Sequence, residues 1–396
     1  MKTISTFLSW TLLLFVAILC FPAGHAIAAE PLTAGALAIP FLGMGLIDIF
    51  DTRTMIEAVE QMYRPGRWLR DTFFPAAVPA DTESLDVDII KGGRKLAPFC
   101  SPLTEGKVVP GVGFTTQTLK PGYIKPKRVT TAADLLTRSP GAILYAGGET
   151  IEQRAQKKLG ADLADLMDTI DRREEWMAAS ALDLGAITMK IKGETADQSV
   201  LVDFQMAATH KITLAGTDLW SDAASDPLAK LASIASTIRK DSGVSPDVLV
   251  LGSDAAAAFV KNAAVQKYMD MLKVDVGQIK PQELPQGVTY ICSLRYPGLF
   301  IDVYSYDEWY EHEDTNVLTP MVPLKKAWLG STRSANRTQY AVIQDIEAIE
   351  GGMAAVSRFP KSWVTKDPAV RWLMVQAAPL PTMKQPDAFA SIQVLA

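Results

Sequence analysis

The residues best able to do chemistry gather in one short acidic stretch, Glu308-Trp309-Tyr310-Glu311-His312-Glu313-Asp314. Carboxylates beside a histidine can bind a divalent cation or exchange protons with a substrate. The spacing of this stretch matches no metal-binding helix motif. We therefore expect a solvated acidic loop, and an enzyme that uses Glu311 and His312 stands as an alternative.

Other candidate motifs lack the sequence context that their chemistry needs. Gly43-Met44-Gly45, Gly111-Val112-Gly113 and Gly147-Gly148 do not lie in a strand–GxGxxG–helix or P-loop setting, so turns are expected there. Ser253 follows Gly252 but is not part of a G-x-S-x-G motif, so it is expected to cap a helix.

The cysteines and histidines give no metal or redox site. Cys20, Cys100 and Cys292 form no C-x-x-C pair, and Cys100 and Cys292 are expected to be buried free thiols, although a disulfide between them stays open. The three histidines are too scattered for a metal site. We therefore predict no catalytic, cofactor-binding or metal-ligating residue, no cofactor, and no enzyme activity.

Composition indicates a globular chain without a nucleic-acid reader's charge. The 396 residues are 48% apolar and 21% charged, with a net charge of −5. This predicts one large or two medium domains and argues against tight, sequence-specific nucleic-acid binding. Lining a nucleic-acid container is still compatible, because a container wall need not bind its contents tightly.

The first residues resemble a secretory signal. Lys2 precedes an apolar run over 7–21, and Ala26-Ile27-Ala28 fits a cleavage site before Glu30. The run is too short for a membrane span. An exported periplasmic or surface protein that uses residues 1–30 is therefore one interpretation. We favour another, in which residues 1–43 are an upstream mis-start and the protein begins at Met44.

The next part of the chain predicts a short helix and then a long extended loop. Thr54-x-x-Glu57 forms a capping box for a helix over 54–63. Leu85, Val87 and Ile89 alternate with aspartates as in a half-buried strand, and 114–119 is a second strand candidate. A long two-stranded loop is marginal in water, so we expect it to lie on something, such as another subunit.

The clearest helix is predicted over 149–184. An apolar stripe runs along it, and Asp162, Arg172 and Glu174 are among the charged residues expected on its other faces. The stripe consists of Leu159, Leu163, Leu166, Ile170, Met177, Ala181 and Leu184. A solitary rod of roughly 50 Å is uncommon in compact enzymes.

The rest of the chain mixes helices and strands. Asp226-Pro227 opens a helix that Gly243 closes, and 247–251 is a short buried strand. Further strands are expected at 200–204, 290–294, 299–304 and 322–330, so this region predicts an α+β domain.

Two stretches resemble segments of lambda-type phage major capsid proteins. Pro121-Gly122-Tyr123-Ile124-Lys125-Pro126-Lys127 is similar to a P-G-Y-[IV]-K-P-K segment at the end of their extended loop. Arg358-Phe359-Pro360-Lys361-Ser362-Trp363-Val364-Thr365 is similar to their R-[FY]-P-K-x-W-V-T motif, with Pro368 and Pro379 following in the same order. The resemblance covers about residue 46 to the end and does not include the leader.

The resemblance implies the Hong-Kong-97-type α+β capsid fold. It implies an arm over 44–80, an extended loop over 81–130, and a peripheral domain over 131–219 and 341–396 that holds the spine helix 149–184. An axial domain over 220–340 completes the fold. Pro121, Gly122, Tyr123, Lys125 and Lys127 would then lie at a subunit interface.

The function implied is that of a major head protein. Hexamers and pentamers of this chain would build an icosahedral virion capsid in the host cytoplasm, with a scaffold, a portal and in some relatives a decoration protein. The shell would enclose double-stranded DNA without sequence-specific binding and without a membrane. We also expect Trp363 and Trp372 to anchor the C-terminal strands to the spine helix, because Phe359, Leu373 and Val375 surround them in the sequence.

Overall fold

The computed structural model describes residues 52–61, 67–75, 77–90, 95–103, 105–109, 111, 113–136, 151–193, 197–272, 282–284 and 287–396. Residues 48–396 belong to one compact unit, which is the part considered below. The predictions for the leader 1–43, for Met44 as the start and for Gly147-Gly148 lie outside the described residues.

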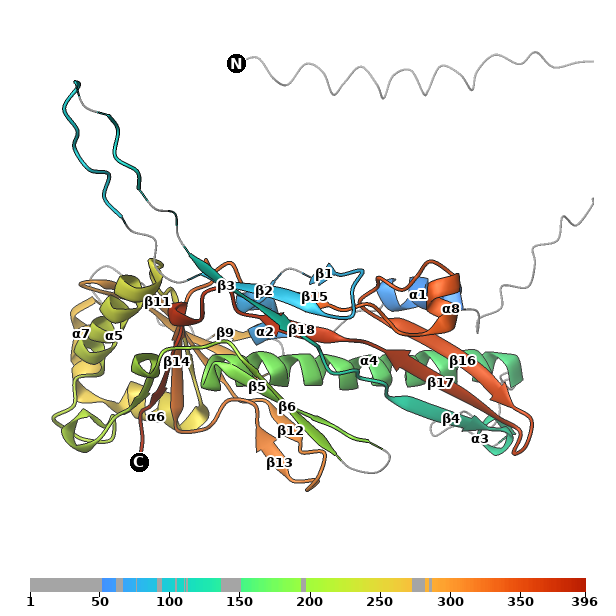
Figure 1. The fold of residues 1–396 in the computed structure, drawn as a ribbon. Helices are drawn as coiled ribbons and strands as arrows, with labels where there is room; N and C mark the ends of the chain where they lie inside the picture. The colour runs from blue at the N-terminus through green and yellow to red at the C-terminus, as the bar shows by residue number, and fades with distance from the viewer. Residues whose placement is uncertain are drawn as a thin grey trace, which may run out of the picture. The chain divides into compact units, whose positions relative to one another are not determined.

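One long helix, α4 (Ile151–Leu184), runs through this unit as its axis (Figure 1). Its 34 residues span roughly 50 Å at ~1.5 Å per residue. The predicted helix is confirmed, and most of its apolar stripe is buried. Two residues depart from the prediction: Leu184 is half exposed, whereas Glu174 is fully buried.

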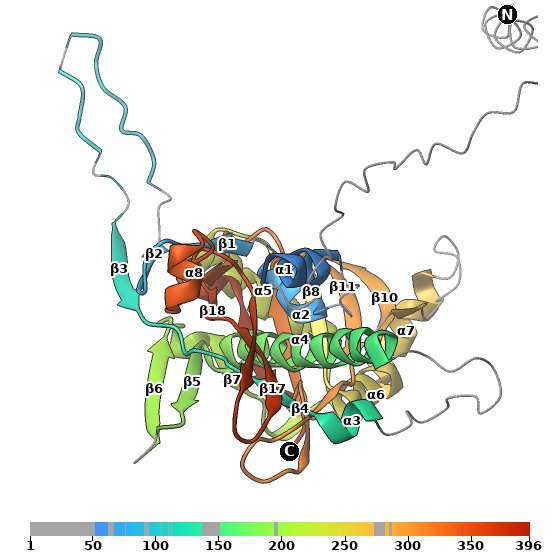
Figure 2. The same cartoon turned by 90° about the vertical axis from the view of Figure 1, so that its right-hand side faces the viewer.

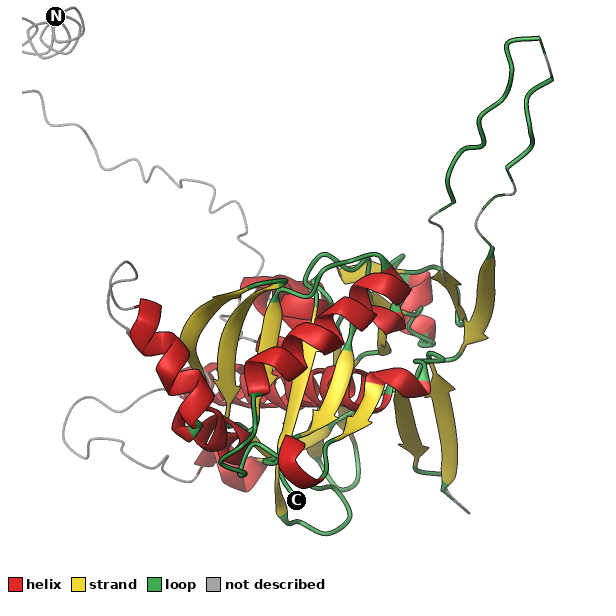
Figure 3. Cartoon of the chain, turned by 90° about the vertical axis from the view of Figure 1, so that its left-hand side faces the viewer, coloured by secondary structure: helices red, strands yellow, loops and turns green. Residues whose placement is uncertain are grey.

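A seven-stranded sheet lies beside the C-terminal end of α4. Its strand order is β7-β19-β14-β8-β11-β10-β9. The strands are β7 (Lys211–Thr213), β8 (Val248–Leu251), β9 (Gln282–Leu284), β10 (Val288–Tyr296), β11 (Leu299–Tyr306), β14 (Lys326–Gly330) and β19 (Ala390–Gln393). Every residue of the central strand β8 is buried, as its unbroken apolar run predicts. Figure 3 shows helices covering these strands.

The covering helices are α5 (Pro227–Ser242), α6 (Ser253–Lys261) and α7 (Ala263–Leu272). The predicted ends of α5 are confirmed: Asp226 accepts hydrogen bonds from two backbone N–H groups, and Gly243 takes a left-handed conformation. Ser253 does not cap α6, because it is already helical and Gly252 occupies the cap. Likewise α1 (Thr52–Gln61) begins two residues before Thr54, so Thr54 lies inside the helix.

A three-stranded sheet covers the N-terminal half of α4. Its order is β16-β17-β4, from β16 (Phe359–Thr365), β17 (Val370–Gln376) and β4 (Lys127–Thr131). Leu373 and Val375 of β17 pack with Leu163, Leu166 and Ile170 of α4. These contacts bury one face of the sheet against the helix.

Smaller elements complete the unit. One sheet has the order β1-β15-β18, and three two-stranded hairpins pair β2 with β3, β5 with β6, and β12 with β13. The elements are β1 (Ala77–Pro79), β2 (Leu85–Ile90), β3 (Phe114–Leu119), β5 (Ala186–Ile191), β6 (Gln198–Asp203), β12 (Trp309–Glu311), β13 (Leu318–Pro320), β15 (Arg337–Tyr340), β18 (Pro379–Thr382), α2 (Trp68–Phe73), α3 (Ala132–Leu136), α8 (Ile346–Glu350) and the short 3-10 turns η1 (Ala208–His210), η2 (Gly216–Asp218) and η3 (Pro386–Ala388).

The β2–β3 ladder forms the base of a long projecting loop (Figure 2). Leu85, Val87 and Ile89 are buried, which confirms the alternating strand predicted there. On the opposite face, Asp86 and Asp88 accept hydrogen bonds from Thr118 and Thr116, each at 2.7 Å. The ladder is therefore fixed to the unit on one side and polar on the other.

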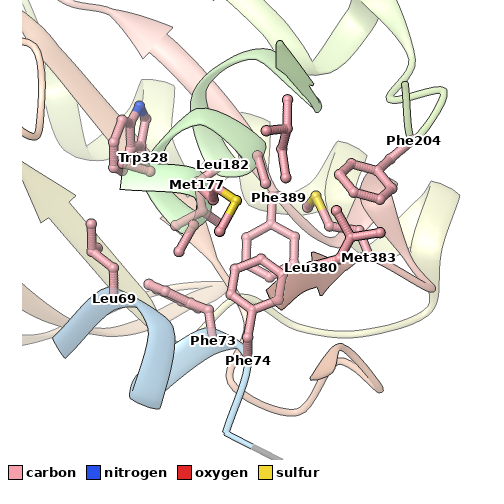
Figure 4. Packing of buried hydrophobic residues seen from close by; sticks show 14 of the residues in the cluster. Leu69, Phe73, Phe74, Met177, Leu182, Phe204, Trp328, Leu380, Met383 and Phe389 are labelled. Carbon is pink, nitrogen blue, oxygen red and sulfur yellow. The ribbon is translucent and has the colours of Figure 1, made fainter. Parts of the chain in front are cut away.

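The largest core cluster joins α2 to β18 and to Phe389 near the C-terminus (Figure 4). Phe73 of α2 packs edge-on against Phe389, with ring centroids 5.5 Å apart. Met177 and Leu182 of α4 and Leu380 of β18 belong to the same cluster. This packing requires a small residue nearby, because a Cβ at Gly330 would lie 2.5 Å from a carbon of the Phe389 ring.

We therefore expect Gly330→Ala to destabilise the folded chain by about 1–3 kcal/mol through overpacking. Urea unfolding of the full chain would measure the change. Gly106→Ala is the matched control, since a Cβ there meets nothing within 4 Å, and its effect should stay within about 0.5 kcal/mol. Equal effects of the two variants would contradict the packing described here.

Candidate assembly surfaces

Five charged residues form a buried arginine cluster on α4. Asp171 and Glu174 of α4 meet Arg67, Arg70 and Arg358, which come from the two ends of the compact unit. Arg67 lies 2.9 Å from Asp171 and 3.0 Å from Glu174. Arg358 lies 2.9 Å from Asp171 and 2.7 Å from Glu174. The cluster thereby ties the chain around the start of α2 and the C-terminal strands to the same turn of α4.

The opposite charges in this cluster keep one another ionised. Burial disfavours an ionised Glu174, but Arg358, Arg67 and Arg70 outweigh it and lower the pKa of that carboxyl. Burial also disfavours the Arg358 guanidinium, yet Glu174, Tyr340 and Asp171 raise its pKa. Tyr340 adds a hydrogen bond from its hydroxyl to Glu174 at 3.0 Å. Removing any one charge would leave its partners buried with less compensation.

Sequence reasoning missed this cluster, although a signal was present. Glu174 is four residues after Ile170 and three before Met177, so it lies on the apolar stripe. A carboxylate at such a position requires a buried cation, and the arginine of the C-terminal motif, Arg358, is one of those that supply it.

The two segments that carry the family resemblance meet in the β16-β17-β4 sheet. Lys127 pairs with Met374, and the N–H of Val375 donates to the carbonyl of Pro126 at 3.1 Å. Pro121 is buried, and Gly122 lies against Met189, 3.4 Å from its Sδ. These contacts hold the end of the extended loop on its own subunit.

Tyr123 also engages its own subunit. Its hydroxyl donates to the carbonyl of Val342 at 2.5 Å and accepts from the N–H of Gln344 at 3.2 Å. Lys125 and Lys127, by contrast, are exposed, and each ammonium lies over an aromatic ring, of Tyr123 and Trp372 respectively. Of the predicted interface residues, these two lysines are the ones left accessible.

The C-terminal motif residues lie in different surroundings. Arg358 and Pro360 are buried, whereas Lys361 forms ion pairs of 2.9 Å with both Asp345 and Glu347. Pro368 follows a cis peptide bond in the β16–β17 turn, and Pro379 is buried at the start of β18. The motif thus combines one core cation with turn and strand residues.

Trp363 and Trp372 do not anchor the strands to α4, contrary to our expectation. Alternation along β17 places Leu373 and Val375 on the helix side and Trp372 on the opposite face. Trp363 is its cross-strand partner, and the two rings stack at 6.4 Å. With Val129, which is exposed, these two half-buried tryptophans form what we call the tryptophan face.

The described residues of the extended loop carry apolar side chains that are almost completely exposed to solvent. Leu96, Phe99 and Leu103 are at least 95% accessible, as fully as in an unfolded chain. Isolated exposed apolar residues are ordinary, but several on one short segment are typical of a surface that a partner covers. Cys100 lies in the same segment and is exposed, whereas Cys292 is buried; both are free, so only the second fits the buried thiol predicted.

The acidic stretch 308–314 is exposed to solvent at Glu311, Glu313 and Asp314, as predicted, but it is not a loop throughout. Its first part is strand β12, which pairs with β13. Glu313 forms an ion pair with Arg173 of α4, and Asp314 lies 2.8 Å from Lys190 of β5. Lys190 lowers the pKa of Asp314 through this hydrogen bond. These carboxylates join the hairpin to its neighbours, and no group of three potential metal ligands occurs in the part of the chain that the structure describes.

Comparisons with known proteins identify the family. The family described as "Phage major capsid protein E" matches residues 51–394. The chain belongs to this family. Among curated proteins, it is 28% identical to the major capsid protein of Escherichia phage lambda over 354 residues, which are 88% of this chain and all of that protein. It is 27% identical to the major capsid protein of Enterobacteria phage phi80, with the same coverage.

The fold agrees with this family. A crystal structure of a prophage capsid protein of E. coli CFT073 superposes with a TM-score of 0.63 at 19% identity, covering 87% of this chain and 99% of the other. The predicted α+β fold of the Hong-Kong-97 capsid type is therefore confirmed. Among the described residues, no helix is both long and apolar enough to cross a membrane.

We expect Arg358→Met to destabilise this capsid-family protein by about 3–5 kcal/mol, because it removes the most deeply buried of the cations that compensate Asp171 and Glu174. Denaturant unfolding of the full chain would measure it. Arg128→Met is the matched control: Arg128 forms ion pairs with Asp165 and Asp162 at the surface, and its loss should cost about 0–1 kcal/mol. A loss below 1 kcal/mol for Arg358→Met would refute the role given to the cluster.

Proposed function

We propose that this chain is the major head protein of a tailed phage or prophage and assembles into an icosahedral shell around double-stranded DNA. Membership of the capsid protein E family supports this function, as does an apolar loop that its own subunit leaves exposed. A shell needs repeated contacts between identical subunits, and such contacts must close under rotation. Hexamers and pentamers of the chain meet that requirement.

We propose a division of the subunit into four parts. Residues 44–80 act as the arm, 81–130 as the extended loop, and 131–219 with 341–396 as the peripheral domain. Residues 220–340 act as the axial domain. Two separate apolar clusters support this division, one around β8, β11 and α5, and another between α4 and β17.

The extended loop is proposed to cover a second copy of the chain, with the tryptophan face as the surface that receives it. Both surfaces are apolar, and Lys127 at the border of the tryptophan face can meet the acidic base of the loop, at Asp86 and Asp88. Lys125 and Lys127 are then the interface residues of the P-G-Y-I-K-P-K segment. Pro121, Gly122 and Tyr123 orient the segment from within.

A scaffold, a portal and in some systems a decoration protein would act with the shell, which holds DNA without reading its sequence. Assembly would occur in the host cytoplasm, and the chain would catalyse no reaction. The alternative, an exported periplasmic or surface protein, depends on residues 1–30 alone.

Substituting Leu96, Phe99 and Leu103 together with serine tests the assembly function. The folded subunit should keep its stability within about 0.5 kcal/mol, because these side chains are exposed. Shells should be lost, as measured by sedimentation and electron microscopy of the expressed chain. Lys107→Ser in the same loop is the control and should still give shells. Normal shells from the triple variant would contradict the proposal.

Mass spectrometry of particles from the induced host tests the leader. If the chain dominates the particles and its first peptide begins at Met44 or Gly45, both the shell function and the upstream mis-start are supported. A chain found instead in the periplasm, beginning near Glu30, would show that the export interpretation is right.

A further inference from the structure

One buried tyrosine hydroxyl lies between two carboxyl groups. The Oη of Tyr306, at the end of β11, is 2.9 Å from Oε1 of Glu175 on α4 and 2.9 Å from Oε2 of Glu308, just before β12. Tyr306 and Glu175 are buried, and Glu308 is partly buried. The three side chains come from three elements that meet at one point beside α4.

The number of hydrogens in this group is too small for two ionised carboxylates. A tyrosine hydroxyl has a single hydrogen, and an ionised carboxylate only accepts. If both glutamates were charged, one of the two 2.9 Å contacts would join oxygens with no hydrogen between them. Two negative charges would also face each other within roughly 6 Å, a distance at which one like charge disfavours ionisation of the other.

Two backbone N–H groups also donate hydrogen bonds to Glu175. Its Oε1 accepts from the N–H of Leu69 at 2.7 Å, and its Oε2 accepts from the N–H of Arg70 at 3.0 Å. These groups belong to the first turn of α2, so the same carboxyl that contacts Tyr306 also holds α2 on the long helix. The Trp68 ring packs over Tyr306, with centroids 5.9 Å apart.

The surrounding charges do not replace the missing hydrogen. The Arg70 guanidinium is directed to Asp71 and the Glu174 side of α4. Arg172 faces Glu308 electrostatically but forms its ion pair with Asp168, whose charge opposes the effect of Arg172 on Glu308. Tyr304 is the other titratable group of β11 packed here, through Trp68.

We propose that Glu175, Tyr306 and Glu308 share one additional proton at neutral pH, and that this proton holds α2 and the β12–β13 hairpin together against α4. With one carboxyl protonated, a continuous chain runs from carboxyl to hydroxyl to carboxylate, and every contact has a hydrogen. The proton belongs to the group as a whole, because either glutamate can carry it. Its loss places two carboxylates on either side of Tyr306 and weakens both attachments.

The electrostatics of the individual groups agree with this arrangement. Burial raises the pKa of Glu175 to about 7, despite the N–H groups of Arg70 and Leu69 that favour its ionised form. Burial also raises the pKa of Glu308. Since the pKa in the folded chain exceeds that of an unfolded glutamate, about 4.3, the stabilisation is complete below that value. It is lost as the pH rises through about 7.

Urea unfolding of the full chain between about pH 5.5 and 8.5 tests the proposal. The folding equilibrium constant of the wild type should fall as the pH rises, by at most about tenfold per pH unit for one proton. Glu308→Gln should weaken this part of the pH dependence, because the amide donates to Tyr306 at every pH, while the burial of Glu175 remains. Glu311→Gln, the same change on an exposed residue of β12, is the control and should keep the wild-type slope.

Infrared spectroscopy gives a second measurement that does not require a variant to fold. The wild type at neutral pH should show the carbonyl band of a protonated carboxyl group, which disappears at high pH. No such band in the wild type would overturn the proposal. A Glu308→Gln slope equal to that of the wild type would also overturn it. A shallower slope together with a weaker carboxyl band in the Glu308→Gln variant would support it.

Discussion

Three arginines that reach Asp171 and Glu174 from distant parts of the chain determine how this fold is held together. Arg67 precedes α2 and Arg358 opens the C-terminal motif, yet both contact the same carboxylates on α4. Such a cluster adds little net stability over an apolar core, because each charge loses its water. Its geometry is selective, however, since any arrangement that separates the arm from the C-terminal strands leaves buried charge unpaired. The remaining elements are positioned around this junction.

The extended loop and the tryptophan face, in contrast, carry apolar side chains that their own subunit does not fully cover. The charges of the cluster on α4 are paired within one subunit, whereas the side chains of Leu96, Phe99 and Leu103 have no cover there. A protein that had to function alone would pay for that exposure in aggregation. A member of a shell-forming family gains from it, because the side chains of the folded interior and those left for neighbours lie on separate segments or on opposite faces of β17.

Much of the fold could be predicted from the sequence where a local pattern dictates it. The stripe of α4, the caps of α5 and the alternation of β2 each follow from short-range spacing. Contacts between distant segments could not be derived in this way. The position of Glu174 in the core depends on Arg358, which is 184 residues further along the chain. The face chosen by Trp363 and Trp372 depends on which side of β17 meets α4, and local apolarity cannot decide that. The resemblance supplied the fold and family where spacing alone did not.

The strand order of the seven-stranded sheet also determines how late in synthesis the subunit can complete its fold. Strand β19 (Ala390–Gln393) lies inside the sheet, between β7 and β14, although it is made after every other strand of that sheet. Until β19 is synthesised, β7 therefore has no partner strand, and one edge of β14 stays unpaired. A chain truncated before β19 cannot complete the sheet. A nascent chain in which β19 is not yet available cannot present a completely folded subunit for assembly. The topology thus restricts the pool available for building to chains whose translation has passed residue 393, before any partner selects among them.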